Sequence, residues 1–463
     1  MQPYIKLITA VLLSVCMHSV SAQYYSYSQL TKAADAAYEQ AHFIKAIDYY
    51  QQAKEINKDY DSDLLFKLGD AAFQVNSLPL AKATIEEYLS RDDIPLAHNA
   101  IFKLGRIAQL TGNYEDALRQ YDLYLSEYNE VDAQTTSNIE FLRSSANWAL
   151  TSDVENAIDT VMRLGDEINS PYSENAPYYQ DGQLYYSSLR FPIEKDKYQR
   201  SKSQMLKETE VMSIPSVEES QLVSNLTFTA DGTQAYFTIC DYVDIYSVHC
   251  KIHKADVTTD GLLANVVALP ESINAIGYTT THPTIAETID GNYLYFATNK
   301  AGGKGGLDIW KSKIEDGTYS IPNVASHINT SGDDLSPFYH NETNTLYFSS
   351  NGRDGYGGHD IFKLEPASDT PINAGDNINS SYNDIHFTLT EDGSSGYFTS
   401  NRPGSRYSDD SYETCCYDIY KAKVKPSLLT STRYLVLGLI LNLAVCKSEL
   451  NIGTVSIVLR LVT

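Results

Sequence analysis

Residues 346–362 read LYFSSNGRDGYGGHDIF, and this stretch decides the fold class. It begins with an apolar, aromatic run typical of a buried strand, continues through a glycine-rich loop and ends in an Asp-Ile-aromatic strand. Residues 294–310 read LYFATNKAGGKGGLDIW. The interval between the second aromatic residue and the aspartate is 12 residues in both copies. This shared register indicates a repeated structural unit.

The unit recurs along the C-terminal half of the chain. The aromatic pairs are spaced by 51, 59, 52 and 50 residues, and they are Tyr185-Tyr186, Tyr236-Phe237, Tyr295-Phe296, Tyr347-Phe348 and Tyr397-Phe398. A repeat of about 50 residues built from short β-runs and acidic-Gly turns is typical of a β-propeller blade, because one small sheet cannot bury its faces alone. We therefore predict a propeller over residues 170–424, with five blades as the favoured count and six as the alternative.

Residues 27–165 differ in composition, being rich in Ala, Leu, Tyr and Glu at helical spacing. Small residues recur in this region at intervals of 35 and 36 residues, at Ala46, Ala81 and Ala117. A period near 34 residues, with a small residue where two helices touch, is typical of tetratricopeptide repeats. We predict an N-terminal α-solenoid of three such helix pairs. A fourth, degenerate pair around Trp148 and Ala157 is expected to cap it.

Such a stack predicts a concave groove lined by the first helix of each repeat. Aromatic side chains in a groove suit recognition of a peptide, and the alternative is that the phenylalanines simply pack between repeats. The predicted groove residues are Tyr38, Phe66, Asp70, Phe73, Asn99, Phe102 and Arg106.

The N-terminus predicts export. Lys6 precedes an apolar run from Leu7 to Val15, and Val20-Ser21-Ala22 offers small residues for cleavage. This pattern is that of a secretory signal over residues 1–22. Cys16 is a poor candidate for a lipid anchor, because Val15 precedes it.

Cysteine usage agrees with an oxidising compartment. Cys240 and Cys250 are ten residues apart and are predicted to form a structural disulfide. A metal site is not expected, because no further His or Cys ligand stands nearby at the usual spacing. The adjacent Cys415 and Cys416 are predicted to form a vicinal disulfide or to pair elsewhere.

Charge limits the partners. The chain has 59 acidic and 35 basic residues and a net charge of -24, which gives no basic footprint for nucleic acid. The acidic-Gly turns lack the alternating oxygen ligands of a calcium loop. We interpret them as hairpin turns.

Motifs for catalysis are missing from the sequence. It contains neither a Gly-x-Ser-x-Gly elbow nor a His-Glu-x-x-His pair. Five-bladed propellers can be glycosidases that use two or three carboxylates at the central channel, and Asp308, Asp360 and Asp418 would be the candidates. Since each takes the same place in its blade, we interpret them as a structural hydrogen-bonding motif. We predict no catalytic residue, cofactor or metal.

The domain order carries a resemblance to a known family. Signal, tetratricopeptide repeats and propeller together resemble the periplasmic OmpA-family proteins of Bacteroidetes-type bacteria, among them the peptidoglycan-linked component of type IX secretion. The Asp-Gly, Tyr-Phe and Asp-Ile-aromatic strings are similar to PD40 or TolB-like repeats of the WD40 type. The resemblance covers about residues 1–424. It implies a periplasmic protein, associated with the outer membrane, whose partners are outer-membrane or periplasmic proteins.

Residues 425–463 depart from that family, in which an OmpA-like peptidoglycan-binding domain normally follows. This tail holds four Lys or Arg, one Glu and no Asp, and its longest apolar run is 13 residues, from Tyr434 to Cys446. About 20 residues are needed to span a bilayer. The alternatives are a truncated remnant, a strand pair of a lost β-domain and a marginal membrane anchor. Direct binding of peptidoglycan through an OmpA-like domain is therefore not expected.

Together these features predict a non-catalytic scaffold for protein–protein interaction, within a secretion or envelope-tethering assembly. The alternative function is binding of a glycan or a peptidoglycan fragment, or glycosidase action, at the propeller channel.

Overall fold

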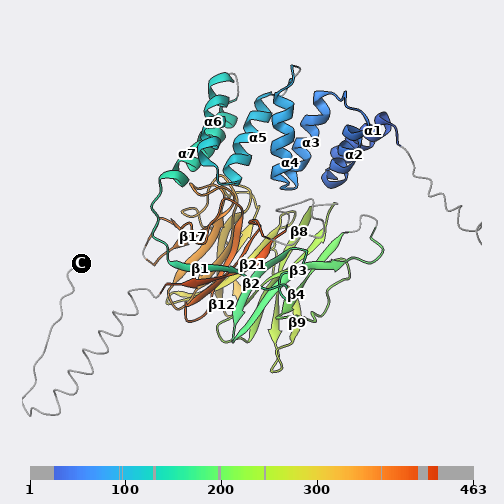
Figure 1. The fold of residues 1–463 in the computed structure, drawn as a ribbon. Coiled ribbons are helices and arrows are strands. Elements are labelled where there is room, and N and C mark those ends of the chain that lie inside the picture. Colours follow the sequence, from blue (N-terminus) through green and yellow to red (C-terminus); the bar gives the residue numbers. More distant parts are fainter. Residues whose placement is uncertain are drawn as a thin grey trace, which may run out of the picture. The chain divides into compact units, whose positions relative to one another are not determined.

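The computed structural model describes residues 25–92, 94–95, 97–128, 132–196, 200–244, 247–366, 368–404 and 416–425. Helices form the first part of this chain and strands the second (Figure 1). The predicted signal segment, Cys415 and the tail from residue 426 onward lie outside the described residues. The chain divides into two compact units between Ile107 and Ala108, which lie within one helix.

The first unit is built from helix pairs. Its helices are α1 (Tyr27–Glu39), α2 (Phe43–Ile56), α3 (Ser62–Gln74), α4 (Leu78–Leu89) and the first part of α5 (Ala97–Leu110). Ser26 begins α1 with a capping box, and the Asp61 carboxylate caps α3, so that otherwise unpaired backbone amides are bonded. A Cβ atom on Gly69 would lie 2.7 Å from the Ile85 side chain, which explains the glycine where α3 packs against α4.

The second unit contains two further helices, α6 (Tyr114–Glu127) and α7 (Ala133–Thr151), before the first strand. The predicted fourth helix pair is wrong. A single helix ends at Thr151, and Ala157 directly precedes a strand, β1 (Ile158–Arg163), so the helical region stops short of residue 165. The reason is tertiary: Ile158 and Val161 pack into the core of the last blade. None of the described helices is long and apolar enough to cross a membrane.

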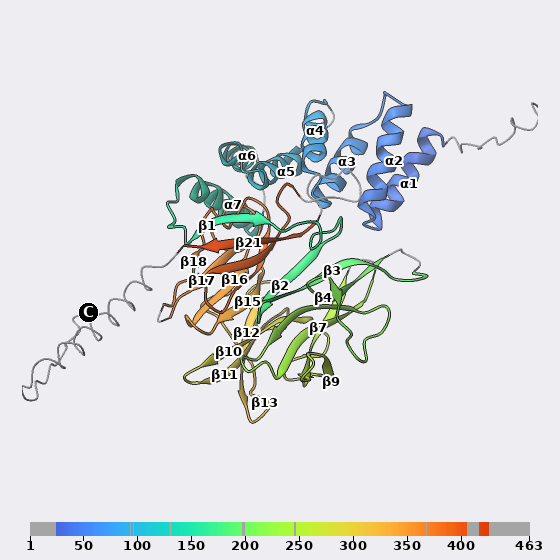
Figure 2. The same cartoon turned by 60° about the horizontal axis from the view of Figure 1, so that its bottom comes forward.

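The strands form five antiparallel sheets that follow one another around a common centre (Figure 2). The first two sheets consist of β2 (Glu174–Gln180), β3 (Gln183–Pro192), β4 (Ser201–Lys207) and β5 (Glu210–Val211), and of β6 (Leu222–Phe228), β7 (Gln234–Tyr242), β8 (Val248–Val257) and β9 (Leu263–Ala268). The third consists of β10 (Thr280–Thr288), β11 (Gly291–Thr298), β12 (Asp308–Glu315), β13 (Thr318–Tyr319) and β14 (Asn323–Val324). The fourth consists of β15 (Asp334–His340), β16 (Thr345–Ser350), β17 (Asp360–Leu364) and β18 (Ile372–Asn373).

The fifth sheet closes the ring. It consists of β19 (Asp384–Leu389), β20 (Ser395–Ser400), β21 (Asp418–Val424) and, as its outermost strand, β1 from the other end of the propeller sequence. Closure by an early strand ties the two ends of the ring together and covers the edge of β21. The prediction of a helical-repeat region followed by a five-bladed propeller is confirmed, and the alternative of six blades is wrong.

Successive blades are joined by asparagine clamps that the sequence reasoning missed. The Asn379 amide accepts a 2.7 Å hydrogen bond from the Ile361 amide N–H and donates a 2.9 Å bond to the Ile361 carbonyl. The equivalent pairs, each with the same two bonds, are Asn169 with Ile419, Asn274 with Ile252, and Asn329 with Ile309. Each isoleucine is fully buried in the third strand of one blade, and each asparagine stands before the first strand of the next. The clamps therefore fix four of the five junctions between blades.

Aromatic residues of the second strands form the core between blades. Phe348 is 1% exposed and packs in one cluster with Phe362 of its own blade and with Ile309 of the preceding blade. Burying such a side chain stabilises the fold by about 2–3 kcal/mol relative to leaving it in water. The repeated aromatic pairs thus specify the blades because each blade needs a neighbour to cover them.

Candidate functional site

The innermost strand of every blade lines the axis of the propeller and contains an irregularity at the same place. At this place the strand pairing shifts register, and a residue other than glycine has a positive φ between 52° and 59°. The five residues are Ala176, Asn225, His282, Ser336 and His386. A positive φ is uncommon outside glycine and marks backbone that the surrounding fold holds for a purpose.

These five residues and the two that follow each of them line an axial cavity of about 40 Å³. That volume is room for a few water-sized groups, since one such group needs about 10–15 Å³. The lining combines the aromatic rings of Tyr178, Phe338 and Phe387 with hydroxyl, amide and imidazole groups. It includes no carboxylate among the described residues.

Two histidines meet at this axis. The rings of His282 and His386 lie edge to face with centroids 5.0 Å apart. The Ser336 backbone N–H donates to His282 Nδ1 over 3.3 Å, and the Asn225 amide nitrogen lies 3.4 Å from His386 Nε2. These contacts join four blades across the axis, because each of the four residues belongs to a different inner strand.

The imidazoles are uncharged at neutral pH. Burial, with a smaller effect of nearby His359, lowers the pKa of His282 to about 4. Burial also lowers the pKa of His386 well below its ordinary value. The axial cavity is therefore polar but neutral, and an imidazolium there would face its neighbour across 5.0 Å without a carboxylate in the lining.

The three predicted aspartates lie away from the axial cavity, at the start of the third strands. Asp308 and Asp360 are each 1% exposed and Asp418 is fully buried. Asp308 accepts hydrogen bonds of 2.9 and 3.1 Å from the backbone amides of Lys304 and Gly305. Their carboxylates therefore occupy positions within the blades rather than at the channel.

The fourth blade shows why the loop before this aspartate is rich in glycine. Asp360 accepts 2.8 Å hydrogen bonds from the Tyr356 backbone N–H and from the Asn373 amide. A Cβ atom on Gly355 would lie only 2.2 Å from the same carboxylate oxygen. Burial raises the pKa of Asp360 well above its ordinary value. The loop wraps the carboxyl group, whose bonds are internal to the protein.

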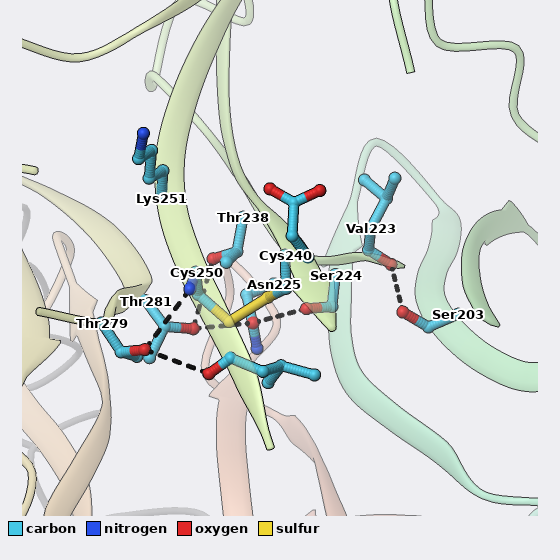
Figure 3. The surroundings of a disulfide bond; sticks show 12 residues. Ser203, Val223, Ser224, Asn225, Thr238, Cys240, Cys250, Lys251, Thr279 and Thr281 are labelled. Carbon is cyan, nitrogen blue, oxygen red and sulfur yellow. Dashed lines mark hydrogen bonds between the residues drawn. A yellow bond between two sulfur atoms is a disulfide. The ribbon is translucent and has the colours of Figure 1, made fainter. Parts of the chain in front are cut away.

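Cys240 and Cys250 are joined by a disulfide with an S–S distance of 2.09 Å (Figure 3). They are directly opposed on β7 and β8. A chain of hydroxyl contacts leads from this region to the axis: Thr238 lies 3.3 Å from Thr281, whose hydroxyl donates over 3.3 Å to the Asn225 side chain. Cys416 is disulfide-bonded as well.

In the first unit, three of the predicted groove residues are brought together by a lysine. Tyr38 of α1 donates a hydrogen bond to Asp70 of α3, and Lys103 of α5 forms a 2.5 Å ion pair with Asp70. The Lys103 ammonium also lies 5.2 Å from the centre of the Phe73 ring. The network links the first helices of three successive repeats.

The same kind of ion pair is found one helical repeat earlier. Lys67 forms a 2.9 Å ion pair with Asp35, so each lysine binds a carboxylate of the preceding repeat. The two lysines are 36 residues apart and the two aspartates 35 apart, so their spacing follows the repeat period in the sequence. These ion pairs are the first-helix contacts that sequence reasoning missed.

The other predicted groove residues are only partly exposed. The Phe66 ring packs on Tyr88 of α4 with a centroid distance of 5.4 Å, so at least part of it belongs to the repeat core. Asn99, Phe102 and Arg106 lie on α5, and each is half-buried.

Comparisons with known proteins concern the propeller. No family model matches this sequence, and no curated protein matches it. A puromycin-hydrolyzing peptidase of Mycobacterium tuberculosis is 12% identical, with a TM-score of 0.30, over 54% of this chain and 47% of that one. This chain thus spans about half the length of that structure.

Two further solved structures are similar. An alpha-L-arabinofuranosidase from Lactobacillus brevis is 11% identical, with a TM-score of 0.37, over 56% of this chain and 93% of that one. A putative TolB from Agrobacterium tumefaciens is 15% identical, with a TM-score of 0.31, over 52% and 76%.

Proposed function

We propose that this protein is a non-catalytic scaffold that binds other proteins in the periplasm, in association with the outer membrane. The observation that carries the proposal is the chemistry of the axial cavity. A propeller glycosidase needs two or more carboxylates at the channel, and the cavity lining offers neutral imidazoles, hydroxyls and aromatic rings. The histidines at the cavity contact residues of other blades and so help to hold the five blades together.

The bonding of the buried aspartates supports the same proposal. Asp308 and Asp360 accept backbone amides of their own glycine-rich loops, which is how a structural carboxylate is held. A general acid or nucleophile must instead face the reacting bond. The glycan-cleaving alternative has no comparable support in the described residues.

The helical repeats supply the proposed binding surface. Ion pairs from Lys67 and Lys103 set the spacing of successive first helices, so the concave face is organised before any partner arrives. Half-buried Asn99, Phe102 and Arg106 of α5 offer both apolar and polar contacts on that helix. Preorganised grooves of this kind suit an extended or helical peptide.

The expected signal segment and the resemblance to periplasmic OmpA-family proteins are the reasons for proposing outer-membrane or periplasmic partners. We propose that these partners belong to a secretion or envelope-tethering assembly.

The test is capture of partners from a detergent-solubilised envelope by the tagged full chain. We expect a defined set of outer-membrane or periplasmic proteins to be recovered at both 150 and 500 mM salt. The higher salt concentration shortens the Debye length and so weakens binding that depends on exposed charges alone. The groove variant Asn99→Ala/Arg106→Gln should lose them. The control variant Lys82→Gln/Glu86→Gln, on the exposed face of α4, should retain them. Recovery of no proteins, together with pelleting on purified peptidoglycan, would overturn the proposal.

A further inference from the structure

The inner strands of the propeller all end in acidic turns at the same end of the channel. Each turn joins an inner strand to the second strand of its blade, and the five turns contain no lysine or arginine. Their acidic residues are Asp181, Asp231, Asp290, Glu342, Glu391 and Asp392, all of them exposed. This concentration of one sign of charge exceeds what hairpin turns require, since Asn-Gly or Gly-Gly would serve equally.

Hydrogen bonds link the second, third, fourth and fifth turns to one another. Glu287, next to the third turn, accepts a 2.8 Å bond from the Ala230 backbone N–H of the second, and its own N–H donates to the Asn341 side chain of the fourth over 2.9 Å. His340 lies 3.1 Å from the Thr390 carbonyl of the fifth. These contacts hold four of the five turns in place relative to one another.

Two of these carboxyl groups have a lowered pKa. Donation from the Thr229 hydroxyl lowers the pKa of Asp231, and donation from the Thr390 hydroxyl lowers that of Asp392. Lys313, which lies beside Gly291 at the end of the third turn, is paired with Glu315 at 2.7 Å and also interacts with Asp290 of that turn. A ring of like charges around an opening raises the local concentration of cations.

The axial cavity at the centre of this ring provides a second, independent observation. Ser336 lines the cavity and is only 5% exposed, yet its hydroxyl has no hydrogen-bond partner within the described part of the chain. A buried hydroxyl without a partner is costly and points to a group that is missing. Beside it, the rings of Tyr178 and Phe338 meet at right angles with centroids 6.4 Å apart.

The geometry points to recognition of a cation. A hydroxyl acceptor beside aromatic rings suits an ammonium group, which a neutral cavity admits without repulsion. The volume of about 40 Å³ fits a primary ammonium and is tight for a planar guanidinium. We propose that the acidic rim and the axial cavity bind a lysine side chain presented on a basic segment of a partner protein. This rests on the proposed scaffold function and names the chemistry of one partner.

The test uses a fluorescent penta-lysine peptide and the full chain, with binding followed by anisotropy at 50 and 300 mM NaCl. The rim variant Asp181→Asn/Glu342→Gln/Glu391→Gln changes three exposed acids whose side chains take no part in the hydrogen bonds between the turns. We expect it to bind the peptide about tenfold more weakly at 50 mM salt, because each exposed ion pair contributes little but three are removed. The affinity of the natural chain should fall steeply at 300 mM.

A matched control separates the rim from the overall charge of the protein. Glu39→Gln/Glu55→Gln/Asp59→Asn removes the same charge from exposed positions on the helical repeats and should leave the affinity unchanged. Ser336→Ala tests the cavity and should weaken binding about fivefold, with thermal unfolding used to check that the fold is retained. Penta-arginine and a peptide of acetylated lysines should both bind more weakly than penta-lysine.

Equal loss in the rim and control variants would overturn the proposal, since binding would then follow net charge alone. Equal binding by the natural chain and Ser336→Ala, or of arginine and lysine peptides, would overturn the role of the cavity. Envelope partners captured equally well by the natural chain and the rim variant, with peptide binding unaffected, would reject the lysine site and leave the scaffold function. Peptide binding that depends on the rim, with no partner captured from the envelope, would support the lysine site and reject the scaffold function.

Discussion

Cys250 of the second blade lies one residue before the position equivalent to Asp360 of the fourth, because Ile361 directly follows Asp360, whereas the equivalent Ile252 stands two residues after Cys250. Each residue is opposed to the second strand of its blade, Cys250 to Cys240 and Asp360 to Ser350. The fourth blade closes this corner with a carboxyl group wrapped by a glycine-rich loop, and the second closes it with a covalent bond. The connection between β7 and β8 of the second blade, residues 243–247, contains no glycine. This explains why a disulfide takes the place of the hydrogen bonds that the glycine-rich loop makes in the fourth blade.

The disulfide is expected to stabilise the second blade. Replacing both cysteines, in Cys240→Ala/Cys250→Ala, should lower the free energy of unfolding by about 2–3 kcal/mol, because the closed loop is short. Cys240→Ser/Cys250→Asp, which places a carboxyl group at this buried position, should be less stable still, since no glycine-rich loop is present to bond that carboxyl group. Urea unfolding of the three proteins measures this order. Equal stability of the aspartate and alanine variants would contradict the role given to the loop.

The asparagine clamps predict a strong effect at the junction between blades. Asn379→Ala leaves the N–H and C=O of Ile361 buried without partners, which should cost about 2–4 kcal/mol. Asn292→Ala, at an exposed position of β11, is the control and should change stability by less than about 0.5 kcal/mol. Thermal unfolding of the two variants compares them. Similar melting temperatures would show that the clamp is dispensable.

The histidine pair predicts a dependence of stability on pH. The folded-state pKa of His282 lies near 4, below that of the unfolded chain, so the folded state prefers the neutral ring. Its contribution is therefore unchanged above about pH 6.5 and falls progressively between pH 6.5 and 4, by up to about 3 kcal/mol. His386 and His359 face the same region and add to this dependence.

His282→Asn tests this dependence, because asparagine tolerates the positive φ at this position. The variant should have a flatter stability profile than the natural chain between pH 6.5 and 4.5. Urea unfolding midpoints over this range give the comparison. Parallel profiles would contradict the assignment of the slope to this ring.

The repeated lysines of the helical region allow a matched comparison. Lys103→Met leaves Asp70, whose side chain is 10% exposed, without its cation and should destabilise the first unit by about 3 kcal/mol. Lys67→Met removes the equivalent ion pair to Asp35, whose side chain is 42% exposed, and should cost less than about 1 kcal/mol. Helical circular dichroism during urea unfolding distinguishes them. An effect of the same size in both would contradict the importance of burial.

The sequence by itself determined the two repeat architectures. Aromatic pairs at intervals of about 50 residues and small residues at intervals near 35 are local patterns, and each repeat must bury the same face against the next, so the pattern records the packing. The spacing of Lys67 and Lys103 was readable in the same way. Pro283 and Pro337 directly follow His282 and Ser336, but nothing local indicated that His282 and Ser336 meet at the axis.

Only the tertiary structure decided how distant segments meet. β1 looked like the end of the helical region, and it is a strand because β21, more than 250 residues later, supplies its hydrogen bonds, with Arg163 bound to Asp418 at 2.5 Å. The axial cavity likewise takes three consecutive residues from each of five blades. Such contacts depend on the closure of the ring, which no window of the sequence contains.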